Sequence, residues 1–135
     1  MNYKIIEPKF ENINSISKEI EHFAEPNIDP KKKRKFISEI NIIIDEVLCN
    51  IIKYSDCTQI EIEYRIEDEF LVIEFKDDGH KFNPLKTQVN LDNMKKNHYN
   101  RESGGLGIFI TLSFADKSEY LYENKKIFKI YKKLK

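Results

Sequence analysis

Hydrophobic residues recur at helical spacing in two segments near the start of the chain. Phe10–Ala24 carries apolar side chains three or four positions apart, and Pro26 and Pro30 then interrupt the pattern. A longer segment, Lys31–Tyr54, repeats this spacing. Its apolar residues fall on one stripe when successive residues are placed about 100° apart around a helix. The pattern therefore predicts two amphipathic helices, each with one face turned toward a core.

Other segments alternate between apolar and polar residues, which is typical of half-buried strands. The segments with strand character are Asn2–Glu7, Ile60–Ile66, Leu71–Phe75, Ser118–Tyr122 and Ile127–Leu134. Short polar turns join the second to the third and the fourth to the fifth, which predicts two hairpins. A further short apolar helix is expected over Gly104–Ala115. This order predicts an α/β (α+β) two-layer sandwich, in which helices cover one face of a mostly antiparallel sheet.

Composition narrows the functional classes. The chain has 135 residues, which suits a single domain over residues 1–135, and its 23 basic and 23 acidic residues give a formal net charge of zero. A protein that coats nucleic acid usually carries a basic excess. The chain begins without the apolar stretch of a signal peptide, and no run approaches the ~18 apolar residues of a membrane span. We therefore expect a cytoplasmic protein that binds neither nucleic acid nor a membrane, with Cys49 and Cys57 as reduced thiols.

Two polar residues border the apolar stripe of the longer helix. Glu46 and Asn50 are four positions apart and so share one face, with Asn50 about 20° from Ile43 of the stripe. An Asn carbonyl oxygen is a suitable ligand for Mg²⁺. A Glu one turn away could accept a proton from a hydroxyl group or orient a water molecule. The alternative is a solvated helix flank with no chemical role.

A carboxylate follows the third strand segment. The alternation of Leu71, Ile73 and Phe75 continues to Asp77, which places this carboxylate on the core side where the strand ends. A buried carboxylate needs donors to offset its desolvation. A purine amino group is one candidate donor, and a nearby backbone N–H or a water molecule is the other. Gly79 allows a turn and a close approach to the backbone, although Asp-Asp-Gly is also an ordinary turn.

Glycines gather at the start of the expected short helix, in the run Gly104-Gly105-Leu106-Gly107. Bare backbone N–H groups at a helix start attract phosphate, whereas the alternative is a flexible entry to the helix. Neither a Walker A loop nor a dinucleotide-binding fingerprint is present. The polar, non-periodic stretch over residues 86–103 is expected to be a mobile lid beside this phosphate site, because long structureless stretches in small domains are often functional.

These motifs, in this order, resemble the N, G1 and G2 boxes of the GHKL (Bergerat-fold) ATPase superfamily. The match includes Glu46 and Asn50, then Asp77-x-Gly79-x-x-Phe82-Asn83-Pro84, then the glycine run. Within that superfamily, Phe82-Asn83-Pro84-Leu85 and the run through Phe109 are most similar to the anti-sigma factor serine/threonine-protein kinases. The resemblance implies one histidine kinase-like ATPase domain that binds ATP with Mg²⁺ beneath an ATP lid.

Residue roles follow from the resemblance position by position. It implies that Glu46 is the catalytic base, that Asn50 holds Mg²⁺, that Asp77 accepts from the adenine amino group and that Gly79 makes the turn beside it. It also assigns further residues to the nucleotide-binding site, namely Phe82, Gly104, Gly105, Leu106 and Gly107.

The same resemblance implies partners. A small anti-anti-sigma protein of the STAS type would be the substrate, phosphorylated on a serine, a sigma factor would be an alternative partner, and the kinase would be a homodimer. The second hypothesis is an ATP-binding regulatory module without phosphotransfer, acting in another signalling complex. The presence of both Glu46 and Asn50 favours the kinase, because a pure binder could dispense with Glu46.

Overall fold

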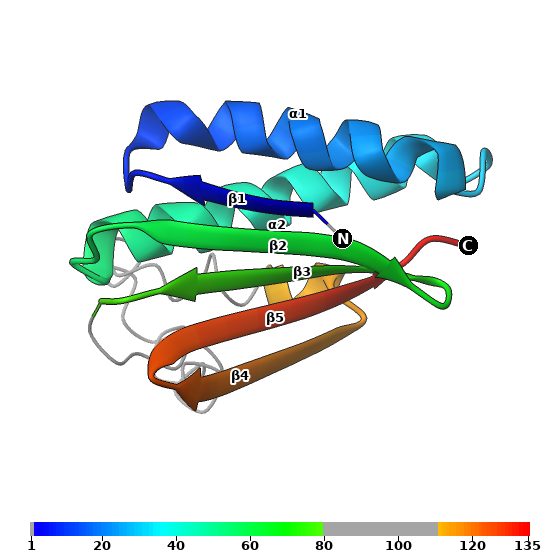
Figure 1. Cartoon of the computed structure of the whole chain (residues 1–135). Coiled ribbons are helices and arrows are strands. Elements are labelled where there is room, and N and C mark those ends of the chain that lie inside the picture. Colours follow the sequence, from blue (N-terminus) through cyan, green and yellow to red (C-terminus); the bar gives the residue numbers. More distant parts are fainter. Residues whose placement is uncertain (1, 80–110) are drawn as a thin grey trace, which may run out of the picture.

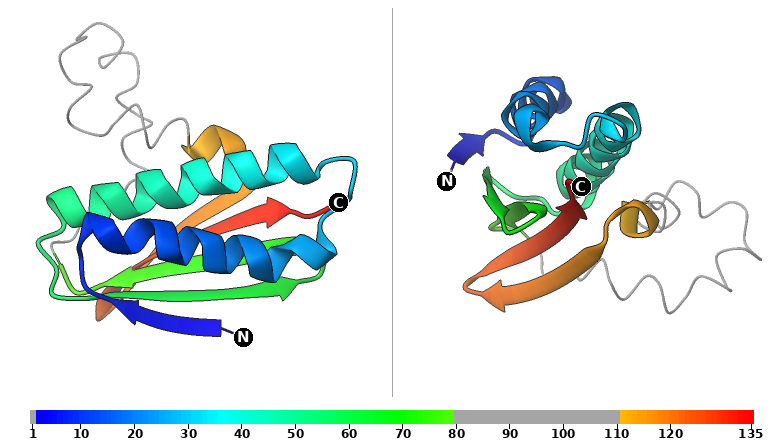
Figure 2. Two further views of the ribbon diagram at one scale, coloured as in Figure 1. Left: turned by 90° about the horizontal axis from the view of Figure 1, so that it is seen from above. Right: turned by 90° about the vertical axis from the view of Figure 1, so that its right-hand side faces the viewer.

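The computed structural model describes residues 2–79 and 111–135, and these form two layers (Figure 1). One layer is an antiparallel sheet in the order β1-β2-β3-β5-β4, and the other contains α1 and α2. Figure 2 shows both helices on one face of the sheet, with the short helical turn at residues 111–114 beside α2. The elements are β1 (Asn2–Ile6), α1 (Ile13–Ala24), α2 (Lys33–Tyr54), β2 (Ile60–Glu67), β3 (Phe70–Asp77), β4 (Lys117–Glu123) and β5 (Lys125–Lys133).

The two helices begin slightly later than their hydrophobic patterns. Residues Phe10–Asn12 form a short 3₁₀ turn before α1. Ahead of α2, the Asp29 carboxylate accepts a 3.0 Å hydrogen bond from the backbone N–H of Lys31, and the Asp29 carbonyl accepts one of 2.9 Å from Lys32. This local turn holds the first basic residues out of the α-helix. The predicted start at Lys31 is thus wrong by two residues.

The core lies between the helices and the sheet. The apolar stripe of α2 is buried as expected, and its fully enclosed members include Ile43, Ile44 and Leu48. From the sheet, alternate residues of three neighbouring strands meet this stripe: Phe75 pairs in register with Ile62 of β2 and Phe128 of β5. Because side chains alternate along a strand, this register puts every second residue of β3 on the helix side, including Asp77 at its end.

The two-layer fold and the antiparallel sheet confirm the predicted fold class. Both predicted hairpins are present, and their turns contain Asp68 and Asn124 in the left-handed region, at φ 54° and 66°. The last residues of the predicted short helix are helical at 111–114. The expected lid over residues 86–103 lies outside the described residues. Within the described part of the chain, no helix has the length and apolar character needed to cross a bilayer.

Candidate nucleotide-binding site

Asp77 is a buried carboxylate at the end of β3, with a side chain that is 4% exposed. Its Oδ1 accepts a 2.5 Å hydrogen bond from the hydroxyl of Ser55 and a 2.9 Å hydrogen bond from the backbone N–H of Gly79. These donors offset the desolvation of the charge. The sequence left open whether a backbone N–H or a ligand meets this carboxylate, and the structure supplies the backbone N–H of Gly79.

Gly79 is required by a close backbone contact. A Cβ at this position would lie 1.9 Å from Oγ of Ser55 and 2.1 Å from its carbonyl oxygen. Contacts this short are not tolerated, so only glycine lets the chain after β3 pass the end of α2. The close approach expected from the sequence is therefore present, and the group that approaches the glycine is Ser55.

Lys126 of β5 completes the cluster. It is the register partner of Asp77 across the antiparallel β3–β5 pair, and its Nζ lies 3.2 Å from Oδ1 of Asp77. The two side chains are 6% and 4% exposed, so this is a buried ion pair. Ser55, Gly79 and Lys126 all meet Oδ1, which leaves Oδ2 as the oxygen that would receive a donor from a ligand.

Asp78 and Cys57 flank this cluster. The hydroxyl and the backbone N–H of Thr58 donate to the Asp78 carboxylate, and these bonds hold the pKa of Asp78 below its usual value. They also tie the end of β3 to the loop that precedes β2. Burial raises the pKa of the Cys57 thiol. A hydrogen bond with Ser55 lowers this pKa, and the negative charges of Asp77 and Asp78 raise it. Cys57 and Cys49 are free thiols, as expected.

Glu46 and Asn50 lie along α2 on the approach to Asp77. Asn50 is buried, and its side-chain Nδ2 has no hydrogen-bond partner among the described residues. Glu46 is half-buried. At 1.5 Å rise per residue, Glu46 precedes Asn50 by about 6 Å along the helix axis, and Asn50 precedes Ser55 by about 7.5 Å. Because Ser55 bonds to Asp77, the three predicted residues follow one path from the helix flank to the strand end.

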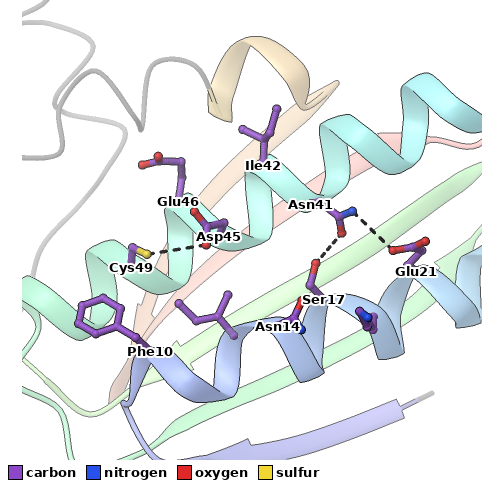
Figure 3. A pocket seen from close by; sticks show the side chains of 11 residues that line it. Phe10, Asn14, Ser17, Glu21, Asn41, Ile42, Asp45, Glu46 and Cys49 are labelled. Atoms are coloured by element: carbon purple, nitrogen blue, oxygen red, sulfur yellow. Dashed lines mark hydrogen bonds between the residues drawn. The ribbon is translucent and has the colours of Figure 1, made fainter.

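A pocket of about 590 Å³ lies between α1 and α2, and Glu46 stands on its rim (Figure 3). Asn41 crosses this pocket, accepting a 2.5 Å hydrogen bond from the Ser17 hydroxyl and donating one of 3.5 Å to Glu21. In Figure 3, Glu46 points from the side of α2 that is turned away from α1. The carboxylate of Glu46 can therefore be reached from outside the protein, whereas Asn50 is enclosed.

The described residues offer few protein ligands for a metal ion, so a bound ion would need further oxygen ligands from a nucleotide. Among residues 2–79 and 111–135, no three His, Cys, Asp or Glu side chains gather into a metal-binding group. Mg²⁺ in nucleotide sites is commonly held by one or two protein oxygens together with phosphate and water. The unpartnered Nδ2 of Asn50 is a donor that suits a phosphate oxygen, and the Oδ1 atom of the same amide is the one that could hold Mg²⁺. A second buried polar atom without a described partner, Oγ1 of Thr111, lies on the helical turn after the glycine-rich segment.

Comparison with known families agrees with this arrangement. The model of the histidine kinase-like ATPase domain matches residues 7–128, nearly the whole chain. The chain belongs to this family. A histidine kinase-like ATPase domain is an ATP-binding module of regulatory proteins, and this coarse function follows from the match.

Solved structures agree with the fold of this histidine kinase-like ATPase domain. The chain is similar to the Acinetobacter baumannii histidine kinase AdeS, with a TM-score of 0.53 and 16% sequence identity over 99% of this chain and 68% of that one. At this identity, the likeness concerns the fold. The comparison with curated proteins finds no match.

Five of the predicted site residues of the ATPase domain lie outside the described residues: Phe82, Gly104, Gly105, Leu106 and Gly107. Of the other four, the structure brings Asp77 and Gly79 together at the end of β3, next to Ser55, and places Glu46 and Asn50 on α2. The sequence did not single out Ser55 or Lys126. A signal for Lys126 exists in the alternation that buries Phe128 and Ile130, since a lysine two positions before Phe128 must share their face.

Proposed function

We propose that this chain is an ATP-dependent serine/threonine-protein kinase that acts as an anti-sigma factor. Its substrate is a serine of a small anti-anti-sigma protein of the STAS type. The observation that carries the proposal is the path from Glu46 through Asn50 to Asp77, in which Ser55 joins the end of α2 to the end of β3. In the proposal, α2 carries the proton acceptor and the metal-binding oxygen, and Ser55 ties its end to the base-reading carboxylate of β3.

In this proposal, Asp77 and Asn50 bind the nucleotide at its two ends. Oδ2 of Asp77 accepts from the amino group of the adenine base, while Oδ1 stays fixed by its protein donors. The amide oxygen of Asn50 is the protein ligand of Mg²⁺, and its buried position limits the orientations of the side chain. Bound Mg·ATP supplies a transferable phosphoryl group whose negative charge the metal offsets.

Glu46 acts as the general base. Its half-buried carboxylate, on the side of α2 that is turned away from α1, accepts the proton of the partner's serine hydroxyl. An exposed entrance is needed here, because the serine arrives on another protein. Glu46 lies four positions before Asn50 and therefore shares its helix face, whereas the exposed neighbour Asp45 does not.

The phosphates would be held by backbone N–H groups of the glycine-rich run Gly104, Gly105, Leu106 and Gly107, with Phe82 beside the base. Sequence resemblance alone supports these assignments and the lid over residues 86–103. The same resemblance supports the choice of partners: the anti-anti-sigma substrate, a sigma factor as alternative partner, and a second copy of this chain in a cytoplasmic homodimer.

A phosphotransfer assay tests the proposal. Purified chain is incubated with Mg²⁺, radiolabelled ATP and a single-domain STAS protein from the same genome, and the label is followed to serine. General bases contribute about 10²–10⁴ in rate, so Glu46→Gln should reduce transfer by that factor while ATP affinity changes less than a few-fold. The matched control Asp45→Asn removes an adjacent, exposed carboxylate of the same helix and should leave transfer intact.

The outcomes separate the two functional hypotheses. Serine labelling that depends on Glu46 supports the kinase. Tight Mg·ATP binding with no transfer to any STAS protein of that genome would replace it with the ATP-binding regulatory module. Absence of nucleotide binding by the folded protein would overturn both.

A further inference from the structure

We propose that Lys126 is a second base-recognition residue, which pairs with Asp77 to read two adjacent atoms of a purine. In this pair, the carboxylate accepts from the ligand and the ammonium group donates to it. The inference rests on the proposed nucleotide-binding function and adds a residue, and with it a base preference, to that site.

The placement of Lys126 supports this role. Its Cα is in register with that of Asp77, and its Nζ lies 3.2 Å from Oδ1 in a pair of side chains that are 6% and 4% exposed. An ammonium group carries three N–H donors, and Oδ1 of Asp77 engages one of them. Among the residues that the structure describes, Asp77 is the one ionic partner of Lys126, so the remaining N–H groups of this lysine and the Oδ2 atom of Asp77 offer a donor next to an acceptor.

A second buried lysine shows what a purely structural role looks like on the same strand face. Lys132 donates a 2.8 Å hydrogen bond to the carbonyl of Phe114, lies 3.6 Å from the Glu39 carboxylate and sits 5.5 Å from the centre of the Phe36 ring. Its contacts join β5 to α2 and to the helical turn at residues 111–114. Lys126 is as deeply buried as Lys132, yet it meets the carboxylate at the proposed base site.

The cost of burying Lys126 also calls for a reason. Charged groups lose hydration on burial, and a hydrophobic pair of similar volume is often as stable as a buried ion pair. The residues that follow on this strand face, Phe128 and Ile130, are apolar, so a hydrophobic pair in place of Lys126 and Asp77 would match its surroundings. Recognition of a polar ligand gives the lysine a function that core packing does not.

Purine chemistry matches the pair. The adenine ring presents an amino donor on C6 next to the acceptor N1, which suits Oδ2 of Asp77 and the ammonium group of Lys126. A 6-oxopurine presents the donor N1–H next to the acceptor O6, which suits the same two groups in the opposite order. A carboxylate alone would instead face the O6 atom with a like partial charge. Lys126 should therefore make the site sensitive to N1 of adenine and tolerant of a 6-oxopurine.

Calorimetric titration with three nucleotides tests the proposal: ADP, 1-deaza-ADP, which has CH in place of N1, and inosine diphosphate. The wild-type protein should bind 1-deaza-ADP about tenfold more weakly than ADP, because a hydrogen bond from a charged donor is lost. Its affinity for inosine diphosphate should lie within about tenfold of its affinity for ADP. Lys126→Met should weaken ADP binding, and ADP and 1-deaza-ADP should then differ in affinity by less than about twofold, a difference that we call the N1 effect. The affinity for inosine diphosphate should fall by a larger factor than the affinity for ADP.

Lys132→Met is the matched control, since it removes the other buried charge from the same face of β5 and should keep the wild-type ranking of all three nucleotides. The wild-type comparison of ADP with 1-deaza-ADP needs no variant and stands even where Lys126→Met fails to fold. Equal affinities of the wild type for these two nucleotides would overturn the role of Lys126 and leave the proposed nucleotide site intact. Retention of the full N1 effect in Lys126→Met would do the same. A folded wild-type protein that binds no ADP would overturn both proposals.

Discussion

The hydroxyl of Ser55 donates a 2.5 Å hydrogen bond to Oδ1 of Asp77, across 22 positions of the sequence. Ser55 also closes the last turn of α2, where its N–H donates to the carbonyl of Ile51 at 3.0 Å. The bond therefore fixes the end of the helix that carries Glu46 and Asn50 to the end of the strand that carries Asp77. This bond, together with the packing of α2 on the sheet, sets the distance between the proposed metal site and the proposed base site.

Replacing Ser55 with alanine should loosen that connection. The change removes one of the three donors to Oδ1 of Asp77, and the loss of a hydrogen bond to a charged group costs about 1.5–3 kcal/mol of unfolding free energy. Urea denaturation measures this cost. Ser15→Ala, at an exposed position of α1, is the control and should change the free energy by less than about 0.5 kcal/mol. Equal effects of the two variants would show that the Ser55–Asp77 bond adds nothing to stability.

Replacing Asp77 with asparagine should weaken nucleotide binding. The amide can turn its own donor toward the adenine amino group, which opposes two donors and costs about 1–3 kcal/mol, or roughly ten- to a hundred-fold in affinity. Titration with ADP at a temperature where the variant remains folded by circular dichroism measures the change. An affinity within twofold of the wild type would remove Asp77 from the base site.

Gly79→Ala should destabilise the fold with or without nucleotide. Its Cβ would lie 1.9 Å from Oγ and 2.1 Å from the carbonyl oxygen of Ser55, so the chain after β3 or the end of α2 must move. Overpacking of this kind costs about 1–3 kcal/mol, measurable by thermal denaturation. The double variant Ser55→Gly with Gly79→Ala removes only the hydroxyl contact. Because the contact with the Ser55 carbonyl persists, we expect the double variant to be no more stable than Gly79→Ala alone. A return to the stability of the wild type would contradict this explanation.

Asp78 should contribute stability that disappears in acid. Hydrogen bonds from Thr58 lower the pKa of Asp78 in the folded protein, whereas an unfolded Asp titrates near pKa ~3.9. A group with a lowered folded pKa stabilises the protein fully above the unfolded pKa, and the effect is lost as pH falls through the folded pKa. The difference in unfolding free energy between wild type and Asp78→Asn should be constant from about pH 5 to 8 and shrink below about pH 4.

The exposed turn residue Asp68 provides the control for this pH series. Asp68→Asn should track the wild type at every pH, because asparagine also tolerates the left-handed backbone conformation at that position. A constant difference between wild type and Asp78→Asn down to pH 3 would show that Thr58 does not stabilise the charged form of Asp78.

The sequence by itself determined the elements and the faces on which some functional residues lie. Helical and strand periodicities are local properties, so the apolar stripe of α2 and the alternation of β3 could be read directly, and the latter placed Asp77 on the core side. The same local geometry put Glu46 and Asn50 on one flank of α2. In β5 the pattern is weaker, because apolar residues such as Ile127 and Tyr131 also occupy the face opposite Phe128, and this concealed the burial of Lys126.

Only the tertiary structure decided which groups meet Asp77. Ser55 and Lys126 reach Oδ1 from the end of α2 and from β5, and neither contact follows from spacing along the chain. The first depends on how the long helix lies across the sheet, and the second on the register between β3 and β5. A shift of one residue in that register would turn Lys126 to the opposite face of the sheet. Packing between distant segments sets both, so the partners of this carboxylate became visible only in the folded chain.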